Sequence, residues 1–293
     1  MLVATMRPTL PLLALLLSAC TSEDGRGPGG GGSAGAGAGG AGGMVGGPTG
    51  AGGSAAVGVG GGAPIGAGGS VSTAGSGLVT YGQPYTGGQF HLGPVDWSES
   101  QFHNACAPGT KYAPAVRSAE GDLLAGLWGG LPDVGGLCDA CIWVTTAMGK
   151  SALLRVVTYG DTTPNSIDVS PQAFAILDSG EYPRAMSWQL AECPASGPLL
   201  YEFQTGANEW WTSLWLRSAR VPIAKVEVQS KNHPTWTALT RGGDGTLTDG
   251  GGFGHGPFSL RVTGIDGAEL VDAFDWPTAG IAGAFLTGKA NFP

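Results

Sequence analysis

Charged residues are scarce in this chain: Asp, Glu, Lys and Arg make up 12% of the 293 residues, and the formal net charge is −8. An acidic chain argues against nucleic-acid binding and against electrostatic attraction to anionic lipids. The four histidines are scattered without the spacing of metal ligands. No Gly-x-Ser-x-Gly elbow is present either, since the one match to that spacing, Gly31–Gly35, lies in the Gly-rich N-terminal segment. The run Gly250–Gly252 lacks the lysine and the helix of a phosphate-binding loop. The sequence therefore predicts no metal and no cofactor, whereas a neutral polymer remains a compatible partner.

The apolar run near the N-terminus, Leu10–Leu17, is too short to span a bilayer as a helix. Arg7 precedes it and Leu17-Ser18-Ala19-Cys20 ends it, a pattern that resembles a bacterial lipoprotein signal peptide with Cys20 as the lipidated residue. Thr21 follows, so the Asp that would retain a lipoprotein in the inner membrane is absent. Residues 1–20 are predicted to export the chain and to anchor it at the outer membrane or cell surface. An ordinary signal peptide, which would give a secreted protein, is the alternative.

Glycine is in large excess, with 55 residues that crowd into the first quarter of the chain. Residues 25–77 are Gly, Ala and Ser with little else, and such a composition cannot bury enough apolar surface to fold. Segment 21–77 is therefore predicted to be a disordered tether. As a flexible coil it spans roughly 40 Å root-mean-square, which lets an anchored domain search a wall or an external substrate.

Residues 78–194 read as a first folded domain with mostly β-strand signals. Hydrophobic residues at helical spacing also predict a helix within Tyr112–Trp128. The predicted strands are Leu78–Tyr81 and Gln89–Leu92 around a turn at Pro84–Gly88, a hairpin of Cys141–Thr145 and Ala152–Val157, and Ala185–Leu190.

The stretch Ile167–Phe174 reads as a strand that runs directly into a helix. Ser170 is a plausible N-cap, and Pro171 suits the first helical position. Asp168 lies just before the cap, where its carboxylate can face a groove. The alternative is that Asp168 only supports the helix N-terminus. An apolar helix face is predicted from Ala173, Phe174, Ile176 and Leu177.

Four cysteines follow Cys20, at positions 106, 138, 141 and 193. Disulfides are the default in an exported chain. A zinc site would need further ligands, for which only His103 and Cys106 lie nearby, and the βαβ context of a thioredoxin-like motif is missing. Four cysteines allow three pairings, and the sequence alone does not choose among them.

Residues 195–293 read as a second domain of strands and turns with the spacing of a β-sandwich, behind a short stiff joint at Pro194–Pro198. Its predicted strands are Leu199–Gln204, Trp210–Leu216, Ile223–Val228, Trp236–Leu239, Phe258–Thr263 and Ala268–Phe274. Trp210 and Trp211 are adjacent, so a regular strand would bury one and leave the other free to be exposed. A flat exposed indole matches the apolar face of a pyranose ring. The alternative is that these two and Trp215 all belong to the core.

Both domains carry a series of short motifs. In the first domain these motifs are Thr80-Tyr81, Gly87-Gly88, Cys138-Asp139-Ala140-Cys141, Val157-Thr158, Asp168-Val169-Ser170-Pro171-Gln172-Ala173-Phe174 and Trp188. In the second they are Leu200-Tyr201-Glu202-Phe203, Gly206, Trp210-Trp211, Arg217, Pro222, Trp236-Thr237, Leu260-Arg261-Val262-Thr263, Ile265 and Asn291-Phe292-Pro293. These motifs occur in the order found in expansins, and the chain resembles a bacterial expansin over about 215 residues.

The resemblance implies a mainly β chain: a six-stranded double-psi β-barrel at 78–194, similar to family-45 endoglucanases, and an immunoglobulin-like β-sandwich at 195–293, similar to family-63 carbohydrate-binding modules. It implies the disulfides Cys106–Cys138 and Cys141–Cys193. It also implies a binding row of three aromatics, two of which match Trp210 and Trp211. The place of the third falls near Asp244, where no aromatic stands, so Trp215 or Phe253 is expected to substitute.

Glycoside hydrolysis normally needs two carboxylates. Asp168 matches the acid of the related endoglucanases, but the stretch that carries their base, Thr80–Pro84, has no carboxylate. Bacterial expansins carry a second groove Asp after a Val-Thr pair. Here Val157-Thr158 is followed by Tyr159 and Gly160, and Asp161 is expected to take the place of that Asp. The resemblance therefore implies a non-hydrolytic wall-loosening protein whose barrel groove contains Thr80, Tyr81, Asp161 and Asp168.

The expected partner is a polysaccharide: cellulose, with xylan or peptidoglycan as alternatives. The protein is expected to be a monomer and to bind no nucleic acid. The membrane is contacted only through the lipid anchor. Two other functions stay open: a polysaccharide-binding surface adhesin, and a wall enzyme like the lytic transglycosylases or endoglucanases.

Overall fold

The computed structural model describes residues 71–74, 77–95, 105–106 and 122–293. Cys20, the signal peptide, most of the tether and His103 lie outside these residues. All of the described residues belong to one compact unit.

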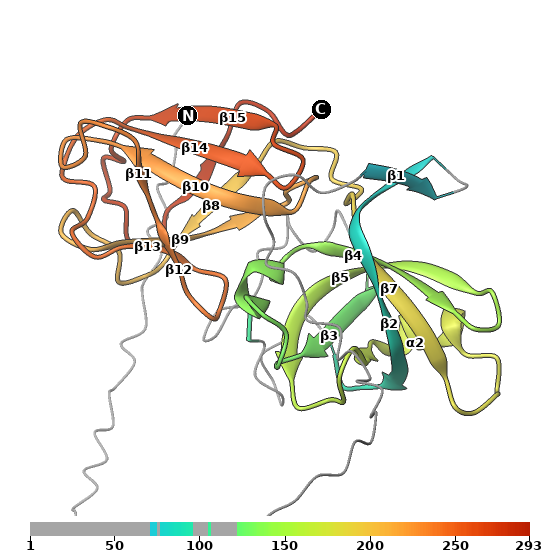
Figure 1. Ribbon diagram of the computed structural model, residues 1–293. Coiled ribbons are helices and arrows are strands. Elements are labelled where there is room, and N and C mark those ends of the chain that lie inside the picture. The colour runs from blue at the N-terminus through green and yellow to red at the C-terminus, as the bar shows by residue number, and fades with distance from the viewer. Residues whose placement is uncertain (1–70, 75–76, 96–104, 107–121) are drawn as a thin grey trace, which may run out of the picture. The chain divides into compact units, whose positions relative to one another are not determined.

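Six strands within the described residues close into a barrel (Figure 1), which confirms the predicted barrel. The strands follow one another in the order β2-β6-β3-β5-β4-β7, and β7 pairs back with β2 to close the ring. The pairs β2–β6 and β3–β5 are parallel and the others antiparallel. The strands are β2 (Leu78–Leu92), β3 (Leu124–Trp128), β4 (Cys141–Thr146), β5 (Ser151–Gly160), β6 (Ile167–Val169) and β7 (Ala185–Ala191).

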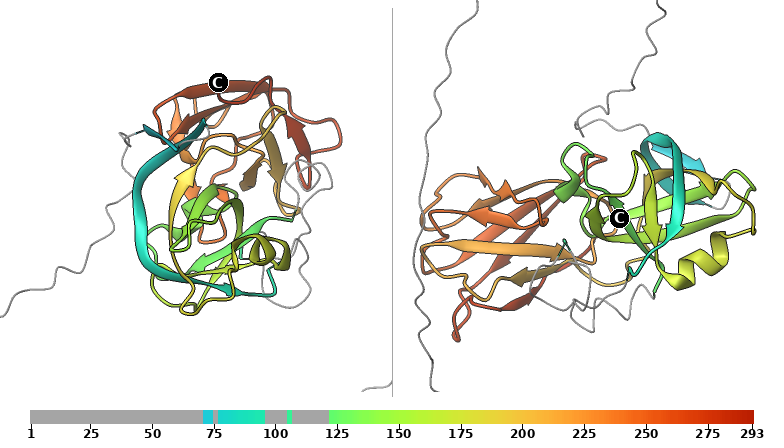
Figure 2. Two further views of the ribbon diagram at one scale, coloured as in Figure 1. Left: turned by 90° about the vertical axis from the view of Figure 1, so that its right-hand side faces the viewer. Right: turned by 90° about the horizontal axis from the view of Figure 1, so that it is seen from below.

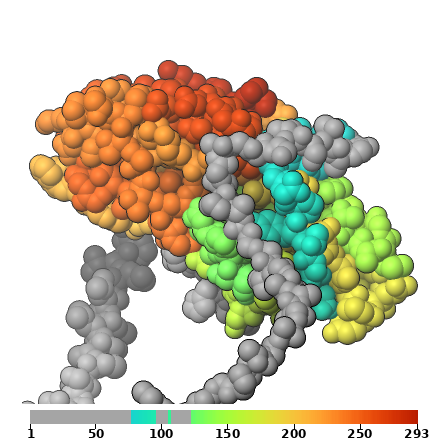
Figure 3. Space-filling model, in the orientation of Figure 1, coloured from blue at the N-terminus to red at the C-terminus, as the bar shows by residue number. Residues whose placement is uncertain are grey.

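Strand β2 is one continuous element of 15 residues, whereas the sequence predicted two strands around a turn at Pro84–Gly88. Its register against β7 shifts between Tyr81 and Tyr85 and again before Gly88. Such bulges let a long strand bend without ending. Figure 2 shows β2 (teal) curving around the barrel, and in Figure 3 its atoms lie beside the yellow atoms of β7.

Two other sequence predictions are wrong in this region. The end of the helix predicted within Tyr112–Trp128 is strand β3, because Leu124 and Leu127 are buried by neighbouring strands rather than on a helix face. Residues 112–121 lie outside the described part. Within the predicted tether, β1 (Val71–Ala74) pairs with the start of β2. Val71 and Thr73 are β-branched residues that favour strands, unlike the glycines before them.

The predicted strand-to-helix connection is confirmed. Helix α2 (Pro171–Leu177) follows β6 directly, with Pro171 in its first turn and the Ser170 hydroxyl accepting from the amide of Ala173. Ala173 and Leu177 are buried, but Ile176 is exposed, so the predicted apolar face is narrower than expected. A short 3₁₀ helix, η1 (Val134–Leu137), precedes the cysteine motif.

The remaining strands form two sheets, which agree with the predicted sandwich. The four-stranded sheet has the order β11 (Thr237–Ala238), β10 (Ile223–Gln229), β14 (Phe258–Gly264) and β15 (Glu269–Phe274). The five-stranded sheet has the order β12 (Thr240–Arg241), β13 (Leu247–Asp249), β9 (Thr212–Arg217), β8 (Leu200–Phe203) and β16 (Phe285–Thr287). The sequence did not predict β12, β13 or β16.

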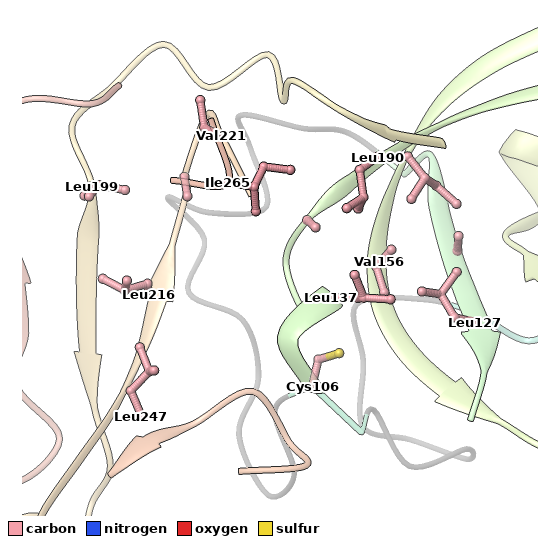
Figure 4. Packing of buried hydrophobic residues seen from close by; sticks show 14 of the residues in the cluster. Cys106, Leu127, Leu137, Val156, Leu190, Leu199, Leu216, Val221, Leu247 and Ile265 are labelled. Atoms are coloured by element: carbon pink, nitrogen blue, oxygen red, sulfur yellow. The ribbon is translucent and has the colours of Figure 1, made fainter. Parts of the chain in front are cut away.

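Buried hydrophobic residues form one cluster that includes members from both parts, among them Leu137 and Val156 of the barrel and Leu216 of the sandwich (Figure 4). Disulfides join Cys106 to Cys138 and Cys141 to Cys193. This is the pairing that the family resemblance implies.

A buried group of charges joins the cysteine motif to the sandwich. The Arg217 guanidinium on β9 pairs with the carboxylate of Asp139, and its Nε donates to Glu202 on β8 at 2.7 Å. Arg155 on β5 donates to the backbone carbonyl of Asp139 at 2.6 Å. Because Arg217 is 0% exposed, these ion pairs offset part of the cost of removing its charge from water.

Candidate functional site

Asp168 lies on β6 between two strands whose backbones approach it closely. Its Cα is opposite His91 on β2 and opposite Gly126 on β3. A Cβ at Gly93 would lie 2.7 Å from the Cβ of Asp168, so glycine is required there. The short elements that meet at this point hold the carboxylate in a fixed, half-buried position.

The environment of Asp168 favours its neutral form. Burial raises the pKa of its carboxyl, the charge of His91 lowers the pKa, and the negative charge of Asp161 raises it further. Asp161 is exposed and follows the end of β5. The structure therefore brings the two predicted groove carboxylates within electrostatic range of each other.

Thr80 and Tyr81 do not fit the predicted role of groove residues, because they are only 2% and 4% exposed. They are opposite Ala191 and Leu190 on β7, where the barrel closes, and their backbone also pairs with β1. Burial, with smaller contributions from Asp266 and Glu192 and an opposing one from Arg220, raises the pKa of Tyr81 to about 12. A buried side chain in this setting contributes to the barrel wall and not to a surface that grips a ligand.

Trp210 is the most prominent aromatic side chain of the sandwich surface, with 71% of its area exposed. It lies in a tight turn before β9, where the amides of Trp210 and Trp211 both donate to Oδ1 of Asn208, at 2.8 and 3.0 Å. Gly252 packs behind this turn at φ 68°, and a Cβ there would lie 2.3 Å from the carbonyl oxygen of Glu209. The indole is therefore exposed on a fixed backbone.

Trp211 is partly buried, and its ring packs against Gly206, where an added Cβ would lie 3.8 Å away. The sequence predicted one buried and one exposed tryptophan. The structure leaves both accessible, because the pair lies in the turn and not within the regular part of β9.

The prediction that Trp215 contributes a binding surface is wrong, since the side chain is 3% exposed. It points away from the sandwich core, but its Nε1 donates to the carbonyl of Asp244 at 3.1 Å and the Arg217 guanidinium lies 5.2 Å from its ring. The loop around Asp244 and the charged junction cover it. Phe253, the other expected substitute, is 0% exposed and packs in the core.

Tyr159 connects the barrel to the sandwich, a role that the sequence did not predict. It lies on β5 two residues before Asp161, and its hydroxyl donates to the carbonyl of Gly243 at 2.6 Å. On the sandwich side, the Ser213 and Thr248 hydroxyls are 2.7 Å apart and join β9 to β13. Asp168 and the exposed tryptophans thus belong to one compact unit, in which Tyr159 joins the barrel to the sandwich.

Among the described residues, no group of three or more His, Cys, Asp or Glu side chains is arranged to hold a metal ion. The same residues include no helix that is long and apolar enough to cross a membrane.

Comparison with known proteins places this fold among expansins, at low sequence identity. No protein-family model matches the chain. Expansin-like protein 6 of Dictyostelium discoideum is 23% identical over 181 residues, which cover 58% of this chain and 61% of that protein. Expansin-like protein 3 of the same organism is 24% identical over 126 residues, or 41% of this chain and 38% of that protein. The chain thus matches less than two thirds of the length of either relative.

Two solved structures share the fold. The apo expansin of Clavibacter michiganensis has a TM-score of 0.56 and 19% identity, over 72% of this chain and 99% of that one. A point variant of the same expansin in complex with cellohexaose has a TM-score of 0.54 and 18% identity over the same shares. The chain is therefore similar to expansin-like proteins in sequence and to an expansin in its fold.

Proposed function

We propose that this protein loosens polysaccharide walls without hydrolysing them. In this proposal the sandwich docks on cellulose or a related glucan through Trp210 and Trp211. The barrel surface around Asp168 then holds a neighbouring chain and weakens its non-covalent contacts. The observation that carries the proposal is the exposed indole of Trp210 on a turn fixed by Asn208.

An exposed tryptophan on a rigid turn supports binding rather than folding. Leaving a large apolar ring in water is unfavourable, so a fixed and exposed one marks a surface for a partner. The ring faces of Trp210 and Trp211 suit the apolar faces of pyranose rings. The cellohexaose bound to the Clavibacter variant is consistent with a β-glucan as that partner.

The surroundings of Asp168 support a grip on the chain rather than cleavage. Hydrolysis needs an acid and a base or nucleophile on either side of the bond. The segment Thr80–Pro84, which would supply the base by family resemblance, has no carboxylate. The half-buried carboxyl of Asp168, whose pKa burial raises, and the exposed carboxylate of Asp161 can both hydrogen-bond to glucan hydroxyls.

The proposal includes the arrangement predicted from the sequence: a barrel domain at 78–194, a sandwich domain at 195–293, and a preceding tether that Cys20 anchors by lipid at the outer membrane or cell surface. Secretion without the anchor is the alternative. The length of the tether would set how far the folded part reaches into a wall.

The division of labour can be tested with two variants of the full chain. Asp168→Ala is expected to abolish extension of isolated cell-wall strips while leaving cellulose pull-down unchanged. The double variant Trp210→Ala, Trp211→Ala is expected to lose cellulose pull-down. If Asp168→Ala weakens pull-down as much as it weakens extension, the two surfaces do not have separate roles.

A wall enzyme is the second candidate, and the proximity of Asp161 to Asp168 favours it. A carboxyl whose pKa is raised by burial and by a second carboxylate resembles the general acid of a glycosidase. Release of reducing sugar from cellulose, or of anhydromuropeptides from peptidoglycan, that disappears in Asp168→Asn would establish this activity. An adhesin would instead bind polysaccharide with no extension activity in the intact protein.

A further inference from the structure

The four-stranded sheet of the sandwich carries a cavity that has no part in the proposed docking surface. Its volume is about 390 Å³, within the ~300–1,000 Å³ of typical ligand pockets. Trp210 and Trp211 precede β9 of the five-stranded sheet, whereas this cavity is lined by the ends of β10, β14 and β15. It therefore belongs to the other sheet.

The cavity lies beside a row of residues on the outer face of the sheet that includes two small side chains, Ser259 and Ala273. Gln229, Ser259 and Ala273 are directly opposite one another on the three strands. Val228 and Phe258, which precede Gln229 and Ser259 in the chain, belong to the core. Because successive side chains of a strand point to opposite faces, Gln229 and Ser259 lie on the outer face. The adjacent row on the same face is bulkier and consists of Glu227, Arg261 and Val271. The step between the two rows makes the hollow.

The wall of this hollow offers polar groups of the kind that recognise sugar hydroxyls. The Ser230 hydroxyl is buried and has no hydrogen-bond partner among the described residues. The Gln229 amide is oriented by its bond to the carbonyl of Pro234, at 2.9 Å. Asp275 adds an exposed carboxylate, and the partly buried Phe274 adds an apolar surface. A hydroxyl, an amide and a carboxylate around apolar rings match a pyranose, which has hydroxyls at its edge and apolar faces.

We propose that this cavity is a second carbohydrate site, which takes a pyranose unit of a neutral glycan. Asp275 disfavours uronic acids and other anions. A molecule that is docked through Trp210 and Trp211 would hold a second chain at the four-stranded sheet. The site goes beyond the proposed function, which uses one docking surface only.

Binding in solution tests this site apart from the first one. The full chain with Trp210→Ala and Trp211→Ala is titrated with cellohexaose in a calorimeter, and saturable binding is expected to remain. Adding Ala273→Phe fills the hollow and is expected to weaken that binding at least tenfold. Val271→Phe, at an exposed position two residues away on the same strand and face, is the matched control and should leave it unchanged.

A second variant separates binding from folding. Ser230→Ala removes a buried hydroxyl that has no partner, so the melting temperature should stay the same or rise. Affinity for cellohexaose should fall by about tenfold if the ligand supplies the missing hydrogen bond. An unchanged affinity together with an unchanged melting temperature contradicts the proposal.

The two proposals fail in different ways. Absence of binding by the tryptophan-free chain, or equal losses with Val271→Phe and Ala273→Phe, overturns the second site and leaves the first intact. Unchanged pull-down of cellulose by the tryptophan-free chain would instead remove the docking role of Trp210 and Trp211. Binding of oligogalacturonate as tight as that of cellohexaose contradicts the assignment to neutral glycans.

Discussion

Trp210 and Trp215 are five residues apart, and their surroundings differ completely. Trp210 is 71% exposed on a turn, whereas Trp215 is covered by the Asp244 loop and by Arg217. The indole of Trp210 is therefore available to a partner, whereas the indole of Trp215 stabilises the fold.

Replacing each of these tryptophans separates the two roles. Trp210→Ala is expected to lower affinity for insoluble cellulose by about tenfold without a change in thermal unfolding, because the ring has few protein contacts to lose. Trp215→Ala is expected to lower the free energy of unfolding by about 3–5 kcal/mol, as for other buried aromatics. Pull-down isotherms and urea titrations measure the two effects. A large loss of stability in Trp210→Ala would contradict the assignment of that ring to the surface.

The raised pKa of Asp168 makes its contribution to stability depend on pH. A carboxyl whose pKa is higher in the folded state favours folding below the ordinary aspartate pKa of about 3.9 and loses this contribution as pH rises through its folded pKa. Asp168→Asn removes the cost of the half-buried charge. The melting temperature of Asp168→Asn minus that of the parent is therefore expected to increase from acidic to neutral pH.

Asp178 provides a control of opposite sign for this measurement. A hydrogen bond from Arg184 lowers the pKa of the Asp178 carboxyl, so its contribution to stability is present above the ordinary aspartate pKa and is lost in acid. The difference in melting temperature for Asp178→Asn is expected to become more negative as pH rises. Parallel curves for Asp168→Asn and Asp178→Asn would contradict the assigned direction for Asp168.

The sequence located Asp168 and Trp210 but could not show which other candidates are accessible. Thr80, Tyr81 and Trp215 were predicted to face a ligand, and all three are buried. Their exposure depends on segments that are distant in sequence, such as β7 for Tyr81 and the Asp244 loop for Trp215. Tyr159 was missed for the same reason, because its contact with Gly243 spans 84 positions.

At the scale of single elements, the sequence predicted those helices and strands whose boundaries depend on nearby residues. The β4–β5 hairpin and the step from β6 into α2 follow from turn chemistry and capping. Strand β3 was predicted as a helix end, since leucines three apart fit a helix as well as a strand buried on both sides. The bends of β2 and the two- and three-residue strands β12, β13 and β16 depend on tertiary pairing, which a single sequence does not reveal.

The connection between β6 and α2 depends on one hydroxyl. Ser170 accepts from the amides of Ala173 and Leu124 and donates to the carbonyl of Asp122 at 2.6 Å. It therefore caps the helix and also joins the helix to the start of β3. An N-cap alone contributes about 1 kcal/mol, and a buried amide without a partner costs a further ~1–3 kcal/mol.

Ser170→Ala is accordingly expected to lower the free energy of unfolding by about 2–3 kcal/mol in urea titrations. Gln172→Ala, an exposed change within the same helix, should have an effect below ~0.5 kcal/mol. Because Asp168 is two residues before the cap, wall extension should fall in Ser170→Ala even at temperatures where the protein is folded. Full extension activity in a folded Ser170→Ala protein would show that the cap does not position Asp168.

At the scale of the whole molecule, the Cys138–Cys141 motif has a structural role that neither zinc nor redox chemistry explains. Both cysteines are in disulfides, and Asp139 between them has a φ of 63°, which directs its carboxylate to Arg217 of the sandwich. Tyr159 and Gly243, and Arg241 with the carbonyl of Gly136 at 3.2 Å, add further contacts between the same two parts. The barrel and the sandwich are therefore expected to unfold together.

Breaking this junction should uncouple the two parts. Arg217→Met removes the guanidinium that pairs with the buried carboxylate of Asp139 and the partly buried carboxylate of Glu202. Arg155 stays 3.9 Å from Asp139, and the expected cost is about 3–5 kcal/mol. Calorimetry should show one unfolding transition in the parent and two in Arg217→Met, because the sandwich loses its link to the barrel. Adding Asp139→Asn removes the charge of one of these two carboxylates and should recover part of the lost stability. As a control, Arg220→Met breaks a half-exposed ion pair with Glu192 and should cost less than ~1 kcal/mol. A single transition in Arg217→Met would mean that hydrophobic packing alone keeps the two parts together. In that case the docking surface and the carboxylates would remain aligned without the charged junction.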